Sequence, residues 1–171
     1  MDWIRTLDLQ SLSPSTLWTV LPEPIREEAA RCAYNDNAPE SRKEVDQAVA
    51  AAIRFRPSAV RQLPVDRRVG YLLSAVHPGD SLAMTLLIAL HLHGRSQLLT
   101  TFLDDLEIEH DNGAINEGFD LQPPPVERLR KAIDALLAAH PAEQVEVYLA
   151  SLCVMDPDTW GGIGAIIADS R

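Results

Sequence analysis

Residues 82–92 read LAMTLLIALHL, and this stretch decides the fold class. Only Thr85 and His91 interrupt the apolar side chains, so a helix formed here is apolar on nearly every side. A helix of that kind is normally buried in the middle of a bundle. We therefore expect a central helix over Leu82–Leu92, capped by Asp80 or Ser81. The run is also too short to cross a bilayer.

Amphipathic patterns lie on both sides of this stretch. Apolar residues recur at intervals of three and four between Val45 and Ile53, which predicts a helix from about Glu40 to Phe55, and Ser41 with Glu44 matches a capping box. Proline and glycine positions predict a short helix that begins at Pro14, a second helix that ends near Tyr34 and a short helical turn after Pro57. Apolar periodicity predicts further helices over about 69–76, 98–106, 126–137, 145–155 and 160–168.

Composition supports the same fold class. The chain has 171 residues, of which 46% are hydrophobic and only 5% aromatic, and alanine and leucine are abundant. This balance favours helix over sheet in a chain long enough for one core. We expect one all-α domain over residues 1–171, either a compact multi-helix bundle or a short stack of helical hairpins, with about eight helices.

Three joins between helices share a pattern that favours the hairpin stack. His77-Pro78, His93-Gly94 and His140-Pro141 each end one apolar segment and begin another. A histidine in the last turn can donate to unpaired carbonyls there, and proline or glycine stops the helix. A shift of 47 residues places His93 on His140 and Leu82 on Leu129. That period suits two-helix solenoid repeats.

One long irregular segment, Glu107–Gln122, interrupts the helical pattern. It contains Asn112-Gly113, the strongest dipeptide signal for a two-residue hairpin turn, so a miniature hairpin is expected near residues 108–115. A long loop inside a compact domain often carries function. This segment is therefore the first candidate site.

Charge is segregated along the chain. The net charge is −10, and the stretch between Arg95 and Arg128 contains eight carboxylates and no basic residue. Asp104 and Asp105 fall in the last turn of a predicted helix, where a carboxylate opposes the helix dipole. We expect something to compensate for them: arginines of the basic segment 54–68, within the chain or across a homodimer, or a basic partner. Arginine suits such pairing because it binds carboxylate and phosphate in a bidentate manner.

The densest group of possible ligands is Glu107-Ile108-Glu109-His110-Asp111. In an extended conformation Glu107, Glu109 and Asp111 would share one side and could hold Ca²⁺ or Mg²⁺. The spacing does not match an EF-hand, and Glu107 with His110 supplies only one of the two Glu-x-x-His pairs of a di-iron bundle. We expect a solvated acidic loop with no metal and no cofactor.

These features favour a non-enzymatic interaction or scaffold domain, which binds a protein partner or a second copy through an acidic surface over residues 104–120. The alternative is a small-molecule-binding or enzymatic bundle that uses the same loop. The candidate binding residues are Asp104, Asp105, Glu107, Glu109, His110, Asp111, Arg67 and Arg68.

Other classes of function fit the sequence poorly. An acidic chain lacks the long-range attraction on which nucleic-acid binding depends. The N-terminal residues resemble no signal segment, so we expect a cytoplasmic protein without a membrane anchor. Cys32 and Cys153 have no partner at metal-ligand spacing and are expected to be two buried thiols. No motif in the chain identifies a reaction.

Overall fold

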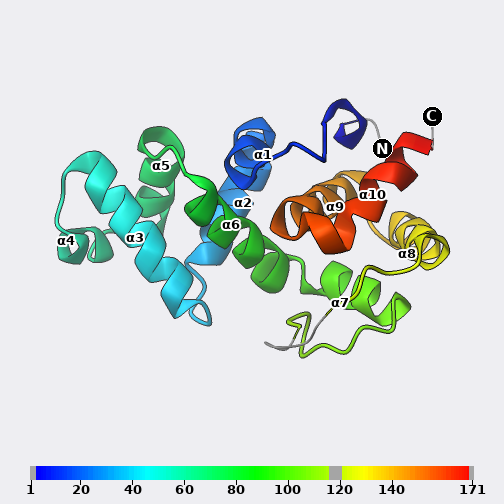
Figure 1. Cartoon of the computed structure of the whole chain (residues 1–171). Helices are drawn as coiled ribbons and strands as arrows, with labels where there is room; N and C mark the ends of the chain where they lie inside the picture. Colours follow the sequence, from blue (N-terminus) through cyan, green and yellow to red (C-terminus); the bar gives the residue numbers. More distant parts are fainter. Residues whose placement is uncertain (1–2, 116–120, 170–171) are drawn as a thin grey trace. The chain divides into compact units, whose positions relative to one another are not determined.

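A computed structural model describes residues 3–115 and 121–169 of the chain. Within these ranges the chain forms ten α-helices and two short helical turns, and it forms no strand (Figure 1). The predicted all-α class is confirmed. The Cα positions group into two compact units, one formed by Pro14–Gly94 and the other by the residues before and after it. Each unit is described by itself, and the single domain over residues 1–171 stays a prediction.

The unit over Pro14–Gly94 surrounds one central helix. Its elements are α1 (Pro14–Val20), α2 (Glu23–Ala33), α3 (Pro39–Ile53), α4 (Pro57–Arg61), α5 (Val65–Ala75), α6 (Asp80–Ala89) and a π-helical turn, η2 (Leu90–Gly94). Helix α6 contacts α1, α2 and α3. Leu86, Leu87 and Leu90 are fully buried, whereas Ile88 is 40% exposed. The predicted central helix is therefore present, with one side chain facing outward.

The end of that central segment differs from the expected regular helix. The last turn widens into η2 instead of continuing to Leu92 as α-helix. At Gly94 a Cβ atom would lie 2.7 Å from the Cys32 sulfur, so the close approach of α2 requires a glycine.

Two predicted helix caps are wrong. Helix α6 begins after Gly79, and the Asp80 carboxylate instead accepts a hydrogen bond of 3.0 Å from the Ser15 N–H in the first turn of α1. Helix α3 begins after Ala38, which places Ser41 inside the helix. The Glu44 carboxylate accepts hydrogen bonds from hydroxyl groups of α6, and the bond from Thr85 Oγ1 is 2.6 Å long. Both carboxylates therefore connect two helices instead of capping one.

The second unit also surrounds a central helix. Its elements are a 3₁₀ turn, η1 (Ile4–Thr6), and the helices α7 (Ser96–Asp105), α8 (Val126–Ala139), α9 (Ala142–Met155) and α10 (Pro157–Asp169). Every residue of 145–154 is buried, and α9 contacts η1, α8 and α10. The buried Glu146 carboxylate accepts a hydrogen bond of 3.2 Å from the Ile4 N–H. Helix α7 is anchored by Phe102, whose ring meets Tyr148 edge to face at 5.4 Å.

The histidines of the helix joins do not have the role predicted for them. Their rings make no hydrogen bond within the described residues, and the backbone closes the helix end instead, as in the 2.8 Å bond from the His140 N–H to the Leu136 carbonyl. His77 is exposed, and His93 and His140 are half-buried. The proline or glycine at each join is sufficient to stop the helix.

The cysteines form no disulfide. Cys153 is buried, and burial raises the pKa of its thiol to about 12. Cys32 is only half-buried, so the prediction of two buried thiols is right for Cys153 alone. In the part of the chain that the structure describes, no helix is long and apolar enough to span a membrane.

A pair of substitutions tests the central position of α6. Leu87→Ala removes a fully buried side chain, whereas Ile88→Ala, its neighbour and matched control, removes one that is 40% exposed. We expect a loss of about 2–5 kcal/mol in the free energy of unfolding for Leu87→Ala and about 1 kcal/mol or less for Ile88→Ala. Urea denaturation of both variants measures the difference. Equal losses would show that α6 does not bury Leu87 in a core.

Candidate functional site

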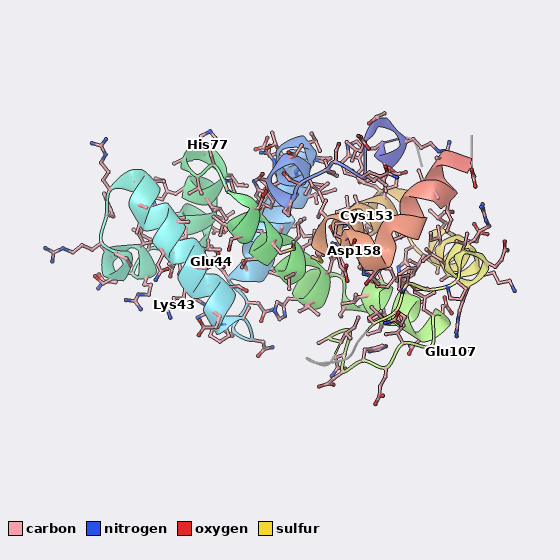
Figure 2. The ribbon with its side chains drawn as sticks, viewed as in Figure 1. Lys43, Glu44, His77, Glu107, Cys153 and Asp158 are labelled. Atoms are coloured by element: carbon pink, nitrogen blue, oxygen red, sulfur yellow. The ribbon has the colours of Figure 1, made fainter. Side chains whose placement is uncertain are left out.

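The acidic segment, defined here as residues 104–111, directly follows the body of α7. Its five carboxylates are all exposed, and Figure 2 labels Glu107 among them. The predicted surface extended to residue 120, and its Glu117 and Asp120 lie outside the described residues. The carboxylates of the described segment are Asp104, Asp105, Glu107, Glu109 and Asp111.

The first part of the segment is fixed by the end of α7. The Ile108 N–H donates to the Leu103 carbonyl and the Glu107 N–H to the Asp104 carbonyl, each at 2.9 Å. This pair of bonds is a Schellman motif, which requires a left-handed residue after the helix. Glu107 adopts that conformation with φ of 53°, where glycine is the usual residue.

A tight turn closes the far end of the segment. Asp111 and Ala114 exchange two backbone hydrogen bonds of 2.8 and 2.9 Å around Asn112 and Gly113, which have φ of 50° and 94°. Two positive φ values identify the type I′ turn that the Asn-Gly dipeptide predicted. A Cβ atom on Gly113 would overlap the Leu99 side chain of α7, so the turn packs closely on that helix. The miniature hairpin is present, reduced to one bridging pair.

His110 joins the two parts of the segment. Its Nδ1 atom lies 3.1 Å from the Gly113 N–H and its Nε2 atom 3.2 Å from Asp104 Oδ1. Because the Gly113 N–H can only donate, we assign the proton of the neutral ring to Nε2, which then donates to Asp104. The ring is 11% exposed, against 73% for the Asp104 side chain. His110 is thus a structural link in the loop, with both ring nitrogens engaged.

The carboxylates differ in their partners. Glu107 pairs with Arg128 of α8, Asp104 with His110, and Asp111 Oδ1 accepts from the Asn112 amide. Asp105 and Glu109 have no ion pair among the residues that the structure describes, so the negative charge of the segment is only partly balanced there.

The extended conformation that would place Glu107, Glu109 and Asp111 on one side is not formed. Glu107 lies in the left-handed cap and Asp111 opens the turn, so the backbone between them is not a strand whose alternation would align the carboxylates. Among the described residues no three His, Cys, Asp or Glu side chains are grouped closely enough to hold a metal ion.

Arg67 and Arg68 belong to the other unit and differ from each other. Arg68 is buried, and its Nη1 atom lies 3.2 Å from Oδ1 of the buried Asp46, while its guanidinium lies 4.5 Å from the centre of the Tyr34 ring. Burial, and then the Asp46 charge, raise the pKa of Tyr34. Arg68 is thus paired with Asp46 and, of the arginines of 54–68, is not the one that compensates Asp104 or Asp105, whereas Arg67 is exposed.

Sequence reasoning missed Asp46. The signal was present, because Asp46 lies between Val49 and Ala50 on the buried arc of α3, and a carboxylate at such a position requires a buried cation.

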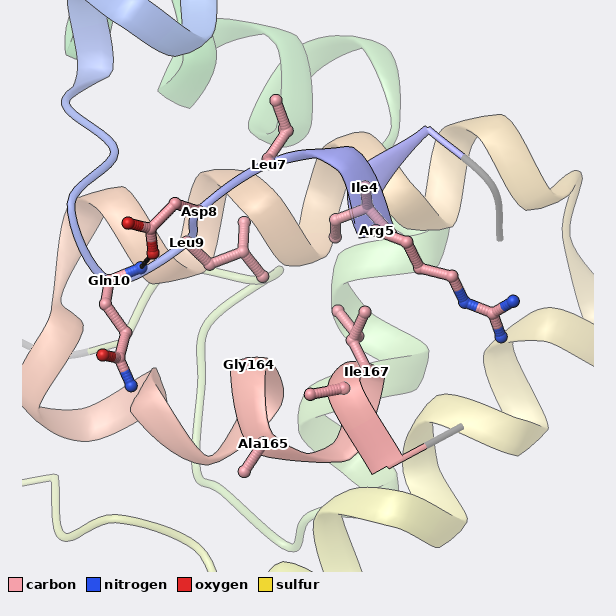
Figure 3. A pocket seen from close by; sticks show the side chains of 10 residues that line it. Ile4, Arg5, Leu7, Asp8, Leu9, Gln10, Gly164, Ala165 and Ile167 are labelled. Atoms are coloured by element: carbon pink, nitrogen blue, oxygen red, sulfur yellow. Dashed lines mark hydrogen bonds between the residues drawn. The ribbon is translucent and has the colours of Figure 1, made fainter. Parts of the chain in front are cut away.

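Three cavities described by the structure lie away from the acidic segment. One of about 240 Å³ lies between η1 and α10 and is lined by residues that include Ile4, Arg5 and Ile167 (Figure 3). Asp8, at the same cavity, accepts hydrogen bonds from the Ser11 hydroxyl and the Gln10 N–H, which lower its pKa.

The second cavity, of about 220 Å³, lies beside Cys153 and Gly161, and the third, of about 190 Å³, lies in the Pro14–Gly94 unit. None of these three cavities was predicted from the sequence, because each combines residues of separate elements.

Comparisons of the chain with models of protein families, with curated proteins and with solved structures found no match. A fold alone does not define a function, so the function has to be argued from the geometry and charge of these sites.

Removal of the Asp105 charge tests whether that carboxylate lacks a cationic side chain as its partner. We expect Asp105→Asn to raise the free energy of unfolding by about 0.3–1 kcal/mol at low salt, because a negative charge in the last turn opposes the dipole of α7. The gain should shrink in high salt. Denaturant titrations at two salt concentrations measure it.

Glu143→Gln is the matched control. It also removes one exposed carboxylate, but in the first turn of α9, where the charge stabilises the helix, so this variant should be less stable. A loss of stability in Asp105→Asn would instead show that a cation holds Asp105.

Proposed function

We propose that the chain is an interaction domain that binds a basic surface of a protein partner through the acidic segment. One observation carries the proposal: Asp105 and Glu109 are exposed and have no ion pair among the described residues, and backbone hydrogen bonds hold the chain on both sides of Glu109.

The backbone of the segment is fixed at several points. The Schellman bonds hold Glu107 and Ile108, the type I′ turn holds Asp111, and His110 links that turn to Asp104. A surface that is already ordered loses little conformational entropy when a partner binds. The backbone that carries the carboxylates is thus held at these points, which favours a specific complex over diffuse attraction.

The electrostatics also favour a basic partner. Asp105 opposes the dipole of α7, and Glu107 occupies a backbone conformation that disfavours side chains. Residues that reduce stability are often retained for function. Complementary charge steers a partner toward the surface and fixes its orientation.

The alternative, a small-molecule-binding or enzymatic role for the same loop, stays a prediction. Both nitrogens of His110 are occupied by Asp104 and Gly113, and none of the three cavities described above is lined by residues of the acidic segment. The geometry therefore supports the interaction role better.

A capture experiment with matched variants tests the proposal. Tagged wild-type chain, Asp105→Asn/Glu109→Gln and Asp134→Asn/Glu143→Gln are used to capture proteins from the source cells, and bound proteins are quantified by mass spectrometry. Both double variants remove two exposed carboxylates, but only the first alters the acidic segment. We expect the wild type and the second variant to capture equal amounts of a partner that has a basic surface.

The purified partner then allows a direct measurement. Its affinity for Asp105→Asn/Glu109→Gln should be about tenfold weaker, since two charge pairs contribute up to about 2 kcal/mol together, and the affinity for wild type should fall as salt rises. Equal affinity for all three proteins, or binding that does not depend on salt, would contradict the proposal.

A further inference from the structure

A small, positively charged cavity lies in the Pro14–Gly94 unit. Its volume is about 190 Å³, and it runs along the first turns of α3 and is closed on another side by α4. Its lining residues are Pro39, Arg42, Lys43, Asp46, Gln47, Pro57 and Arg61. Three of them carry a positive charge and come from two helices.

The single carboxylate that lines the cavity is already neutralised. Asp46 is only 2% exposed and pairs with the buried Arg68 through both carboxylate oxygens, at 3.2 and 3.3 Å. The charges that remain to act on a ligand are those of Arg42, Lys43 and Arg61, so the cavity is net positive.

Arg42 holds a donor that has no acceptor in the described chain. Its Nη2 atom donates to the Asn35 carbonyl at 2.9 Å and to Asp36 Oδ1 at 3.0 Å, which fixes the guanidinium. Its Nε atom is buried and makes no hydrogen bond within the described residues. Buried donors are nearly always paired, so an oxygen acceptor beside this N–H would be favourable.

We propose that this cavity binds a phosphate-type oxyanion, with an oxygen accepting from Arg42 Nε and further oxygens facing Lys43 and Arg61. A tetrahedral oxyanion offers acceptors in several directions and matches cations that come from two elements, whereas a planar carboxylate offers two acceptors in one plane. The phosphate is either the free ion or the head of a small phosphate ester.

The surroundings strengthen the attraction for an anion. Arg54, Arg56 and Arg67 are exposed and have no ion pair among the described residues, and Asp66, the one carboxylate of segment 54–68, is paired with Arg31 at 2.6 Å. The α3 helix also directs the positive end of its dipole toward Pro39, at the edge of the cavity.

Two carboxylates compete with the anion, and both are held weakly. Glu40 lies 3.8 Å from Lys43 Nζ, and the fully exposed Asp36 pairs with an Nη atom of Arg42 and not with the buried Nε. Exposed pairs of this kind exchange readily with solvent ions. This site is independent of the acidic segment, which belongs to the other unit.

Ligand titrations with charge-matched variants test the site. The wild-type chain, Lys43→Gln/Arg61→Gln and Arg54→Gln/Arg67→Gln are titrated with inorganic phosphate and with glycerol 3-phosphate, against sodium chloride at equal ionic strength. Each double variant loses two exposed positive charges, but only the first loses lining residues. Circular dichroism confirms that each variant is folded.

We expect phosphate to raise the thermal midpoint of the wild type and of Arg54→Gln/Arg67→Gln in a saturable manner. Lys43→Gln/Arg61→Gln should bind about tenfold more weakly, because two exposed charge contacts are lost. The ¹H–¹⁵N resonance of Arg42 Nε should shift as phosphate is added to the wild type. Tighter binding of inorganic phosphate would identify the free ion as the ligand, and tighter binding of glycerol 3-phosphate would identify a small phosphate ester.

Three results would overturn the proposal. The first is an effect of phosphate no larger than that of chloride. The second is an equal loss of binding in both double variants, which would show general attraction to a basic surface. The third is an Arg42 Nε resonance that does not move while the midpoint rises, which would place the anion elsewhere.

Discussion

A helix with a large buried apolar surface organises each unit of this chain. Helix α6 contacts α1, α2 and α3, and helix α9 contacts η1, α8 and α10. A helix without a polar face is stable in water only when neighbours cover it, so the surrounding amphipathic helices are arranged by this requirement. The polar groups near these central helices, such as Glu146 and Glu44, then make specific bonds to neighbouring elements.

The sequence predicts the helices better than their contacts. Apolar periodicity locates α3, α6 and most other helices, because the 3.6-residue period can be recognised within each segment without knowledge of its neighbours. The cap prediction at Ser41 is wrong because α3 already begins after Ala38, and the one at Asp80 is wrong because its carboxylate bonds to α1. The buried pair of Asp46 and Arg68 spans 22 residues, and only the folded chain brings its members together.

The same distinction holds for the acidic segment. Asn112-Gly113 predicts the type I′ turn because the dipeptide favours two positive φ values in succession. Its packing on Leu99 and the link that His110 makes to Asp104 depend on how the loop returns to α7, which local preference does not specify. The sequence therefore located the candidate surface but not the contacts that hold it in one conformation.

Nuclear magnetic resonance measures directly whether the acidic segment holds this one backbone conformation. Ring ¹⁵N shifts of His110 and backbone order parameters over residues 105–114 are recorded on the isolated protein at neutral pH. We expect His110 to have a single neutral tautomer, protonated at Nε2, and the backbone order parameters to be near those of α7, about 0.85. A mixture of tautomers with order parameters below about 0.6 would contradict this expectation, because the carboxylates would then lie on a flexible loop.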